Sequence, residues 1–238
     1  MHRERTRGFE RLELAPGGTR TVVYVAGSGP DVVYLHGGGT FHGFEFARDW
    51  LHRFRVTLPY HPGFGESTDD SRVETMQAYG RHLRALCDAL GIQKMHLVGA
   101  SLGGRLAAEF TLANHDRVRT LVLVAPAGIA LPEHPQPDFS RIAHRDWPQY
   151  FVHDPEYIRP FWPEEPDQAF VEARAREARS VGRLLADAAA QTSEFARGLR
   201  GNLRRPYFID RRLRLFALTN FVLQNLHDLH LLFETQFG

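Results

Sequence analysis

The sequence predicts an α/β fold, in which a doubly wound, mostly parallel sheet carries helices on both faces and a helical lid insertion. Two observations in the first half predict the sheet. Short β-branched runs alternate with segments of helical period, and glycine, proline or other turn residues separate them. A third observation predicts the lid: residues 131–200 hold prolines and aromatic residues, then a helical stretch, and no candidate strand.

The elements follow one another in regular order. The predicted strands are short apolar or β-branched runs, at residues 21–26, 31–35, 55–58, 94–99 and 118–125. The predicted helices lie between them, at residues 41–53, 73–90 and 101–114. Gly91 ends the second of these helices. Because parallel strands need crossover connections, this alternation indicates βαβ units.

Changes in composition along the chain predict three parts. We expect a core over residues 1–130, a helical lid over 131–200 and an atypical helical segment over 201–238. An ordinary pair of connecting helices is the alternative to a lid. The last segment carries an apolar stripe at helical spacing, formed by Leu215, Leu218, Val222, Leu226, Leu229 and Phe233. Residues 207–209 are its only candidate strand.

Composition excludes several classes of protein. The chain has 238 residues, 43% hydrophobic and 24% charged, which excludes a wholly disordered chain. A net charge of +1 gives no bulk attraction to nucleic acid or anionic membranes. No apolar run approaches the roughly 20 residues that cross a bilayer, and residues 1–20 hold no signal-peptide core. The single Cys87 favours a reducing compartment, so we expect a cytoplasmic protein.

The strongest motif is Gly99-Ala100-Ser101-Leu102-Gly103-Gly104, between a predicted strand and a predicted helix. In this G-x-S-x-G pattern the turn is so tight that the flanking positions must lack bulk. The turn holds the serine side chain out at the end of the sheet, in a strained backbone conformation. The following helix directs its N-terminal N–H groups at the same point, which favours developing negative charge. The bare G-x-S-x-G pattern is weak evidence for a nucleophilic serine, but between a strand and a helix it is strong evidence.

Two glycine-rich loops follow other predicted strands. In His36-Gly37-Gly38-Gly39 the glycines let backbone N–H groups approach a ligand oxygen. Such a loop pairs with the N–H of the residue after the serine, here Leu102, as an oxyanion hole. A plain glycine turn is the alternative. The other loop, residues 61–67, is by itself typical of a Pro/Gly turn. We expect His36 to shape its loop and His61 to have a structural or substrate-facing role, rather than either acting as a base.

Taken together, these motifs resemble the α/β-hydrolase family. The matching residues are 36–39, 62–67, 99–104 and 121–129, and the resemblance covers about residues 20–195. It implies that Ser101 is the nucleophile and that the N–H groups of Gly38 (or Gly39) and Leu102 form the oxyanion hole. The motif order is similar to that of lid-bearing hydrolases that cleave esters or carbon–carbon bonds. Serine here, where related dehalogenases and epoxide hydrolases carry aspartate, implies an acyl-enzyme and no metal or organic cofactor.

The resemblance does not extend past the lid. The family places an acid and then a histidine after the serine, on a strand and a loop that are not recognisable here. Asp210 is the remaining candidate acid, with Asp228 behind it, and His230 is the candidate base, with His227 as the other late histidine. An exposed helix face is the alternative for both histidines. A metal site at His227, Asp228 and His230 is rejected because no further ligands accompany them.

Two functions therefore remain open. The first is a serine hydrolase that cleaves a carboxylic ester or related acyl or carbon–carbon bond of a small, partly apolar substrate. The second is a catalytically incomplete α/β-hydrolase-like chain, inactive or with a binding role only. In that case a truncated, frame-altered or diverged C-terminus replaces the last strands of the fold. The apolar stripe over 215–233 would then cover the exposed sheet face or pair with a second subunit.

Overall fold

The sheet of the computed structural model confirms the predicted fold class. The structure describes residues 6–127, 141–142, 144–151, 154, 156, 158, 161–163 and 165–190. Its strands are β1 (Glu10–Leu14), β2 (Thr21–Ala26), β3 (Asp31–Leu35), β4 (Arg55–Pro59), β5 (Met95–Ala100) and β6 (Val118–Val124). They form one sheet in the order β1-β2-β4-β3-β5-β6. The pairs β1–β2 and β2–β4 are antiparallel, and the pairs from β4 through β3 and β5 to β6 are parallel.

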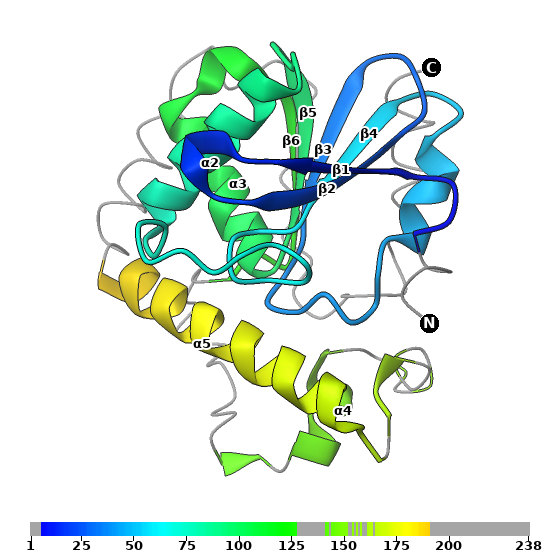
Figure 1. The fold of residues 1–238 in the computed structure, drawn as a ribbon, viewed down its shortest axis with the longest axis vertical. Helices are drawn as coiled ribbons and strands as arrows, with labels where there is room; N and C mark the ends of the chain where they lie inside the picture. Colours follow the sequence, from blue (N-terminus) through cyan, green and yellow to red (C-terminus); the bar gives the residue numbers. More distant parts are fainter. Residues whose placement is uncertain are drawn as a thin grey trace.

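Helices cover the two faces of this sheet unequally. Helices α2 (Met76–Ala89) and α3 (Leu102–Ala113) lie on one face, and the 3-10 helix η2 (Glu45–Trp50) lies on the other (Figure 1). Alternate residues of the central strands pack in the cores on opposite faces of the sheet, as the pleat requires. In β3, Val33 packs in the core under α2 and α3, whereas Val32 packs in the core under η2. Thr75 starts α2, since its side chain accepts a hydrogen bond from the Ala78 N–H at 3.1 Å.

Most predicted elements agree with the structure; one predicted helix does not, and one observed strand has no predicted counterpart. The predicted helix over 41–53 is wrong: only the short η2 forms, because Gly43 adopts a φ of 66° and interrupts the segment before Phe44. Strand β1 was not predicted, because its Glu-Arg-Leu-Glu-Leu sequence is mostly charged. It pairs along the edge of β2, from Glu10 opposite Val25 to Leu14 opposite Thr21.

A long helix, α5 (Gln168–Ala190), confirms the helical pattern predicted over 167–190. The Asp167 side chain caps it by accepting a hydrogen bond from the Phe170 N–H at 2.8 Å. In Figure 1, α5 crosses below the sheet, and it forms hydrogen bonds with loops that follow β3 and β4. The short elements η1 (Pro16–Gly18), η3 (His115–Arg117), η5 (His144–Asp146) and α4 (Pro148–Phe151) complete the described structure.

Several expectations concern other parts of the chain. The proposed boundaries near residues 130 and 200 and the segment 201–238, with its apolar stripe, lie outside the described residues. Among the residues that are described, no helix has the length and apolarity to cross a bilayer.

Candidate active site

The backbone of Ser101 is strained and firmly held. Ser101 connects β5 to α3 with φ 51° and ψ −116°, a left-handed φ that costs a non-glycine residue about 1–3 kcal/mol. Its N–H donates to the Val124 carbonyl at 2.8 Å. Its carbonyl accepts from the N–H groups of Gly104, Arg105 and Ala127 at 3.0, 3.1 and 2.9 Å. Contacts with both neighbouring elements therefore maintain the conformation that the motif predicts.

The glycines of the motif are required by close backbone contacts. A Cβ on Gly103 would lie 2.2 Å from the Leu35 carbonyl oxygen and 2.5 Å from that of His36. A Cβ on Gly99 would lie 2.3 Å from the Gly103 carbonyl oxygen. These partners are backbone atoms, which cannot rotate away as a side chain can. The turn from β5 into α3 is thus packed directly against the end of β3.

The loop over residues 36–40 lies beside Ser101. A Cβ on Gly37 would lie 3.2 Å from Ser101 Cβ and 3.8 Å from Ser101 Oγ. Leu102 is the first residue of α3, so its N–H is one of the helix donors without an intrahelical acceptor. The structure thus brings Ser101, the loop with Gly38, and Leu102 together at one end of the sheet. Their catalytic roles stay predictions.

Two buried histidines shape this loop, as the sequence predicted. His36 Nδ1 donates to the Gly37 carbonyl at 2.7 Å, and His36 Nε2 accepts from the His61 N–H at 3.0 Å. Burial lowers the pKa of His36 to about 4 and lowers that of His61 well below its usual value. The two rings lie 4.0 Å apart, centroid to centroid. Both nitrogens of His36 are used within the loops, so this ring cannot take a proton from Ser101.

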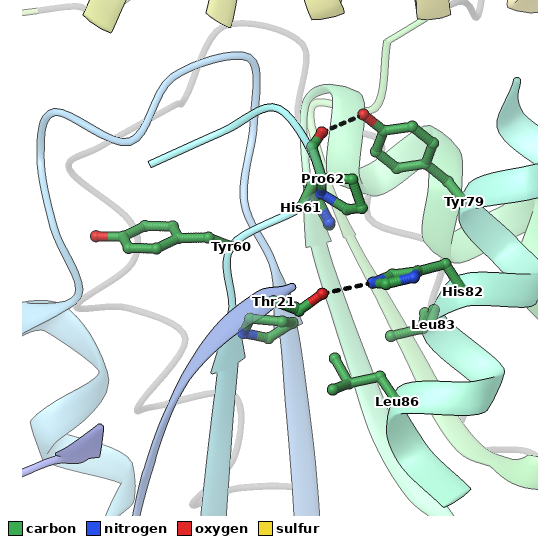
Figure 2. Close-up of a pocket in the computed structure, with 9 residues that line it drawn as sticks. Thr21, Tyr60, His61, Pro62, Tyr79, His82, Leu83 and Leu86 are labelled. Atoms are coloured by element: carbon green, nitrogen blue, oxygen red, sulfur yellow. Dashed lines mark hydrogen bonds between the residues drawn. The ribbon is translucent and has the colours of Figure 1, made fainter. Parts of the chain in front are cut away.

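A small hollow lies behind these histidines, between α2 and the strands β2 and β4 (Figure 2). His82 Nε2 and Thr21 Oγ1 are 2.9 Å apart across it, and the Tyr79 hydroxyl donates to the Pro62 carbonyl. Its lining residues are Thr21, Pro59, Tyr60, His61, Pro62, Tyr79, His82, Leu83 and Leu86. No residue of the serine turn is among them, so this hollow is not a site for a substrate of Ser101.

Helix α5 packs against the loops that surround Ser101. A Cβ on Gly38 would lie 3.0 Å from Val181 Cγ2. The Glu177 carboxylate accepts from the Thr40 N–H at 3.4 Å and from the Thr40 hydroxyl. Farther along the helix, Asp187 Oδ2 accepts from the N–H of Met76 at 2.8 Å, at the start of α2.

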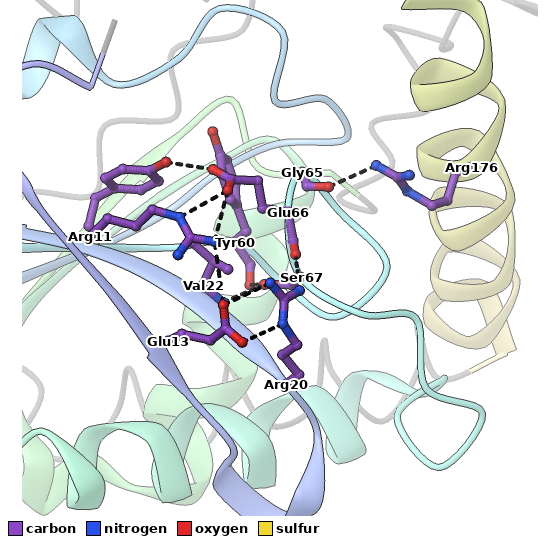
Figure 3. A network of polar contacts seen from close by, with 10 residues as sticks. Arg11, Glu13, Arg20, Val22, Tyr60, Gly65, Glu66, Ser67 and Arg176 are labelled. Carbon is purple, nitrogen blue, oxygen red and sulfur yellow. Dashed lines mark hydrogen bonds and ion pairs between the residues drawn. The ribbon is translucent and has the colours of Figure 1, made fainter. Parts of the chain in front are cut away.

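The loop over residues 65–67 is held from two sides (Figure 3). On one side Arg176 Nη2 of α5 donates to the Gly65 carbonyl at 2.7 Å. On the other side Arg11 Nε of β1 donates to Glu66 Oε2 at 2.9 Å, and the Tyr24 hydroxyl of β2 donates to Glu66 Oε1 at 2.5 Å. Ser67 Oγ links this loop further to the strands by accepting from the β2 backbone at 2.9 Å. The loop therefore connects the edge of the sheet to α5.

Comparison with known proteins identifies the fold. A family model described as the alpha/beta hydrolase fold matches residues 30–193. The chain belongs to the α/β-hydrolase fold family. This confirms the resemblance that the motifs indicated, and the matched range includes both glycine loops, Ser101 and α5.

Curated relatives match part of this chain. A 2-hydroxy-6-oxo-6-phenylhexa-2,4-dienoate hydrolase from Burkholderia cepacia is 36% identical over 118 residues, covering 44% of this chain and 39% of the relative. A 2-hydroxy-6-oxo-2,4-heptadienoate hydrolase from Pseudomonas putida is 33% identical over 129 residues, covering 50% of this chain and 45% of the relative. The matches therefore span less than half the length of these relatives.

A solved structure agrees in fold. The naproxen esterase (carboxylesterase NP) from Bacillus subtilis superposes with a TM-score of 0.58 and 22% identity, covering 72% of this chain and 61% of that one. At this identity the likeness supports the fold alone.

The structure does not reach the predicted acid and base. Asp210 and His230, with His227 and Asp228, lie outside the described residues, so the structure does not test the proposed acid and base. The described part of the chain contains no group of three or more His, Cys, Asp or Glu side chains able to hold a metal ion.

Sequence reasoning missed Glu177 and Thr40, which the structure brings together at the 36–40 loop. The only local signal is the spacing of three between Arg174 and Glu177, which surface helices also show.

Proposed function

We propose that this α/β hydrolase is a serine hydrolase that cleaves a carboxylic ester, or a related acyl or carbon–carbon bond, through an acyl-enzyme. The observation that carries the proposal is the left-handed φ of Ser101 at the N-terminus of α3. A strained residue at such a point is typical of a functional site, because only surrounding contacts maintain it. The loop that carries Gly38 faces this serine and supplies a second source of backbone donors.

The chemistry follows from these donors. Ser101 Oγ attacks the substrate carbonyl carbon, a C–O bond forms, and the carbonyl π electrons move to oxygen. The N–H groups of Leu102 and Gly38 stabilise that oxyanion, and losing one such donor typically lowers the rate about 10²–10³-fold. The oxyanion then collapses, the bond to the leaving group breaks, and the leaving group takes the proton that serine lost. Water hydrolyses the acyl-enzyme by the same steps and restores Ser101.

A base must accept the serine proton. His36 uses both ring nitrogens in the loops, and burial keeps both His36 and His61 neutral with lowered pKa values. The proposal therefore assigns the base to His230, oriented by Asp210, with His227 as the competing histidine.

The names of the relatives narrow the substrates worth testing. Curated relatives are hydrolases of 2-hydroxy-6-oxo-dienoates, and a structural neighbour is an esterase. A short p-nitrophenyl ester tests acyl transfer in general, and a 2-hydroxy-6-oxo-dienoate tests carbon–carbon cleavage. The proposed substrate is small and partly apolar in both cases.

The deciding experiment is Ser101→Ala against Ser71→Ala, a matched change at an exposed serine. We expect Ser101→Ala to lower ester turnover at least about 10⁴-fold and to abolish labelling by a serine-reactive phosphonate. Ser71→Ala should change neither. Turnover that persists unchanged in Ser101→Ala would refute the proposal.

The same assay addresses the catalytically incomplete alternative. A folded wild-type chain that neither turns over the esters nor reacts with the phosphonate would favour the binding role. Where Ser101-dependent turnover is present, His230→Ala and His227→Ala locate the base. Loss of turnover in His230→Ala alone supports the proposed triad.

A further inference from the structure

We propose that Glu177 of α5 is a positioning residue, whose carboxylate holds the 36–40 loop so that its N–H groups face the oxygen bound at Ser101. The proposal rests on the proposed function for its catalytic consequence. Glu177 touches neither Ser101 nor the reacting atoms, and it acts through the loop.

The Glu177 carboxylate is buried and collects four donors from three segments. The residue is only 2% exposed. Its Oε1 accepts from the Thr40 hydroxyl and, at 3.2 Å, from the Gly65 N–H. Its Oε2 accepts from Arg174 Nη1 at 2.6 Å and from the Thr40 N–H at 3.4 Å. One side chain thus joins α5, the 36–40 loop and the loop after β4.

This arrangement requires a carboxylate rather than a general polar group. An ionised carboxylate accepts on both oxygens and donates nothing, which matches four converging donors. A glutamine at position 177 would present one acceptor oxygen and an NH₂ group that faces other donors. A buried donor left without an acceptor costs about 1–3 kcal/mol, so the loop would move to satisfy it. Glu177→Gln therefore breaks the contact while it preserves the size of the side chain.

Contacts of α5 also enclose the residues just before Thr40. A Cβ on Gly39 would lie 2.5 Å from Arg174 Nη1, and one on Gly38 would lie 3.0 Å from Val181 Cγ2. Arg174 is held by its ion pair with Glu177 and lies 5.1 Å from the Phe41 ring centroid, in cation–π range. A run of glycines has few intrinsic conformational preferences. The direction of its N–H groups must therefore be set by neighbouring contacts, and α5 supplies them.

The other end of the contact is fixed to the sheet. Both polar groups of Gly65 bond to α5, its N–H to Glu177 and its carbonyl to Arg176. The next residue, Glu66, is bonded to β1 and β2 (Figure 3). Glu177 is thereby linked, through Gly65 and Glu66, to the edge of the sheet. Thr40 therefore bonds to a carboxylate whose position is fixed by these other contacts.

An alternative explanation is that Glu177 only attaches α5 to the rest of the molecule. Asp187 Oδ2 also attaches α5, because it accepts from the Met76 N–H at the start of α2 at 2.8 Å. This contact involves no residue of the 36–40 loop. Asp187→Ala thus weakens attachment of α5 without touching Thr40, and it separates the two explanations.

The experiment compares Glu177→Gln with Glu172→Gln, the same chemical change on the exposed face of α5. Thr40→Val, which removes the hydroxyl, is compared with Thr40→Ser, which keeps it. Steady-state turnover of a p-nitrophenyl ester gives kcat and KM separately. Amide hydrogen exchange of the peptide over residues 36–44 reports on the loop without any need for activity.

We expect Glu177→Gln and Thr40→Val to lower kcat about 10- to 100-fold with KM within about twofold, because misplaced donors act mainly on the transition state. Exchange in the 36–44 peptide should be faster in both variants. Glu172→Gln, Thr40→Ser and Asp187→Ala should remain close to wild type in kcat and in exchange.

Three results would overturn the proposal: wild-type kcat and exchange in Glu177→Gln, an equal loss of kcat in Asp187→Ala, or a rise in KM alone. If Glu177→Gln does not fold, the Thr40→Val and Thr40→Ser pair decides the question by the same criteria. An inactive wild type would refute the proposed function. Exchange in the 36–44 peptide would then still decide whether Glu177 holds the loop.

Discussion

The turn at Ser101 and helix α5 meet over the same loops, but different kinds of contact hold them. The turn is fixed by backbone hydrogen bonds and by glycines that approach backbone oxygens closely. The polar contacts of helix α5 come from charged side chains whose partners lie far along the chain, such as Thr40, which is 137 residues from Glu177. The turn at Ser101 leaves no room for a Cβ on Gly99 or Gly103, whereas α5 is positioned by the contacts of a few side chains.

The attachments of α5 differ in strength among themselves. The side chains of the Arg183–Asp69 pair are 32% and 38% exposed, and ion pairs of this kind contribute about 0–1 kcal/mol. Glu177 is buried, and the nearby Leu184 belongs to the same apolar core as Leu102 of α3. The comparison teaches that α5 is joined at its buried face to the end of the sheet that carries Ser101, and that the exposed ion pairs of α5 add little.

The largest effect is expected from Gly103→Ala. The added Cβ would lie 2.2 Å from the Leu35 carbonyl oxygen, so α3 or β3 must move. We expect a loss of unfolding free energy of about 3 kcal/mol or more, together with loss of phosphonate labelling at Ser101. Urea denaturation and the labelling assay measure the two effects.

Gly80→Ala provides the control for that change. Gly80 lies within α2, and no atom outside its own helix backbone is near enough to meet an added Cβ. In a helix interior, alanine is more stable than glycine by about 0.5–1 kcal/mol, so this variant should be slightly stabilised. Wild-type stability and labelling in Gly103→Ala would contradict the conclusion that the backbone contacts of the turn leave no room for a Cβ at this position.

Local patterns predicted the turn and the central strands. The boundaries of β2 and β3 follow directly from β-branched runs between turn residues, and the glycine spacing around Ser101 is itself the steric requirement that the structure shows. The edge strand β1 has no such signal. Its charged side chains are accommodated because Glu13 pairs with Arg20, and Arg11 pairs with Glu66.

The contacts of α5 could not be predicted in the same way. The helix carries several Glu and Arg residues, and nothing local separates the buried Glu177 from the exposed Glu172. Only the folded chain brings Thr40 and Gly65 to one carboxylate. The same limit applies to the acid and base, because Asp210 and His230 were chosen from chain order rather than from a local pattern. Sequence spacing therefore finds sites built within one segment more readily than sites assembled from several.

A further effect is expected from pH, through two buried histidines, and each of them alone contributes no more than the change at Gly103. Burial lowers the pKa of both His36 and His82 to about 4, whereas an unfolded histidine titrates near 6.5. Between these values the unfolded chain binds more protons than the folded chain. Stability is therefore retained above about pH 6.5 and lost as pH falls toward 4, by roughly 3 kcal/mol per histidine.

Urea denaturation at several pH values between 7 and 4.5 tests this expectation with His82→Gln. The variant keeps an amide able to bond Thr21 but does not titrate, so its stability should fall less steeply with acid than that of wild type. His115, whose side chain is exposed, supplies the matched control His115→Gln. An equally steep acid dependence in His82→Gln and wild type would mean that His82 is not buried as a neutral ring.

The smallest effect, from Gly182→Ala in α5, tests whether the helix and the turn at Ser101 unfold together. An added Cβ meets no atom within 4 Å, so we expect a gain of about 0.5–1 kcal/mol. Gly91→Ala is the contrast: its Cβ also meets open space, but its φ of 71° makes alanine unfavourable by about 1 kcal/mol.

Thermal unfolding measures global stability, and amide exchange over residues 168–190 measures the stability of α5. Because Leu184 packs in the core that contains Leu102, both should rise in Gly182→Ala. Slower exchange in α5 without a change in global stability would show that α5 opens independently of the turn, and that its contacts with the 36–40 loop form and break while the sheet stays folded.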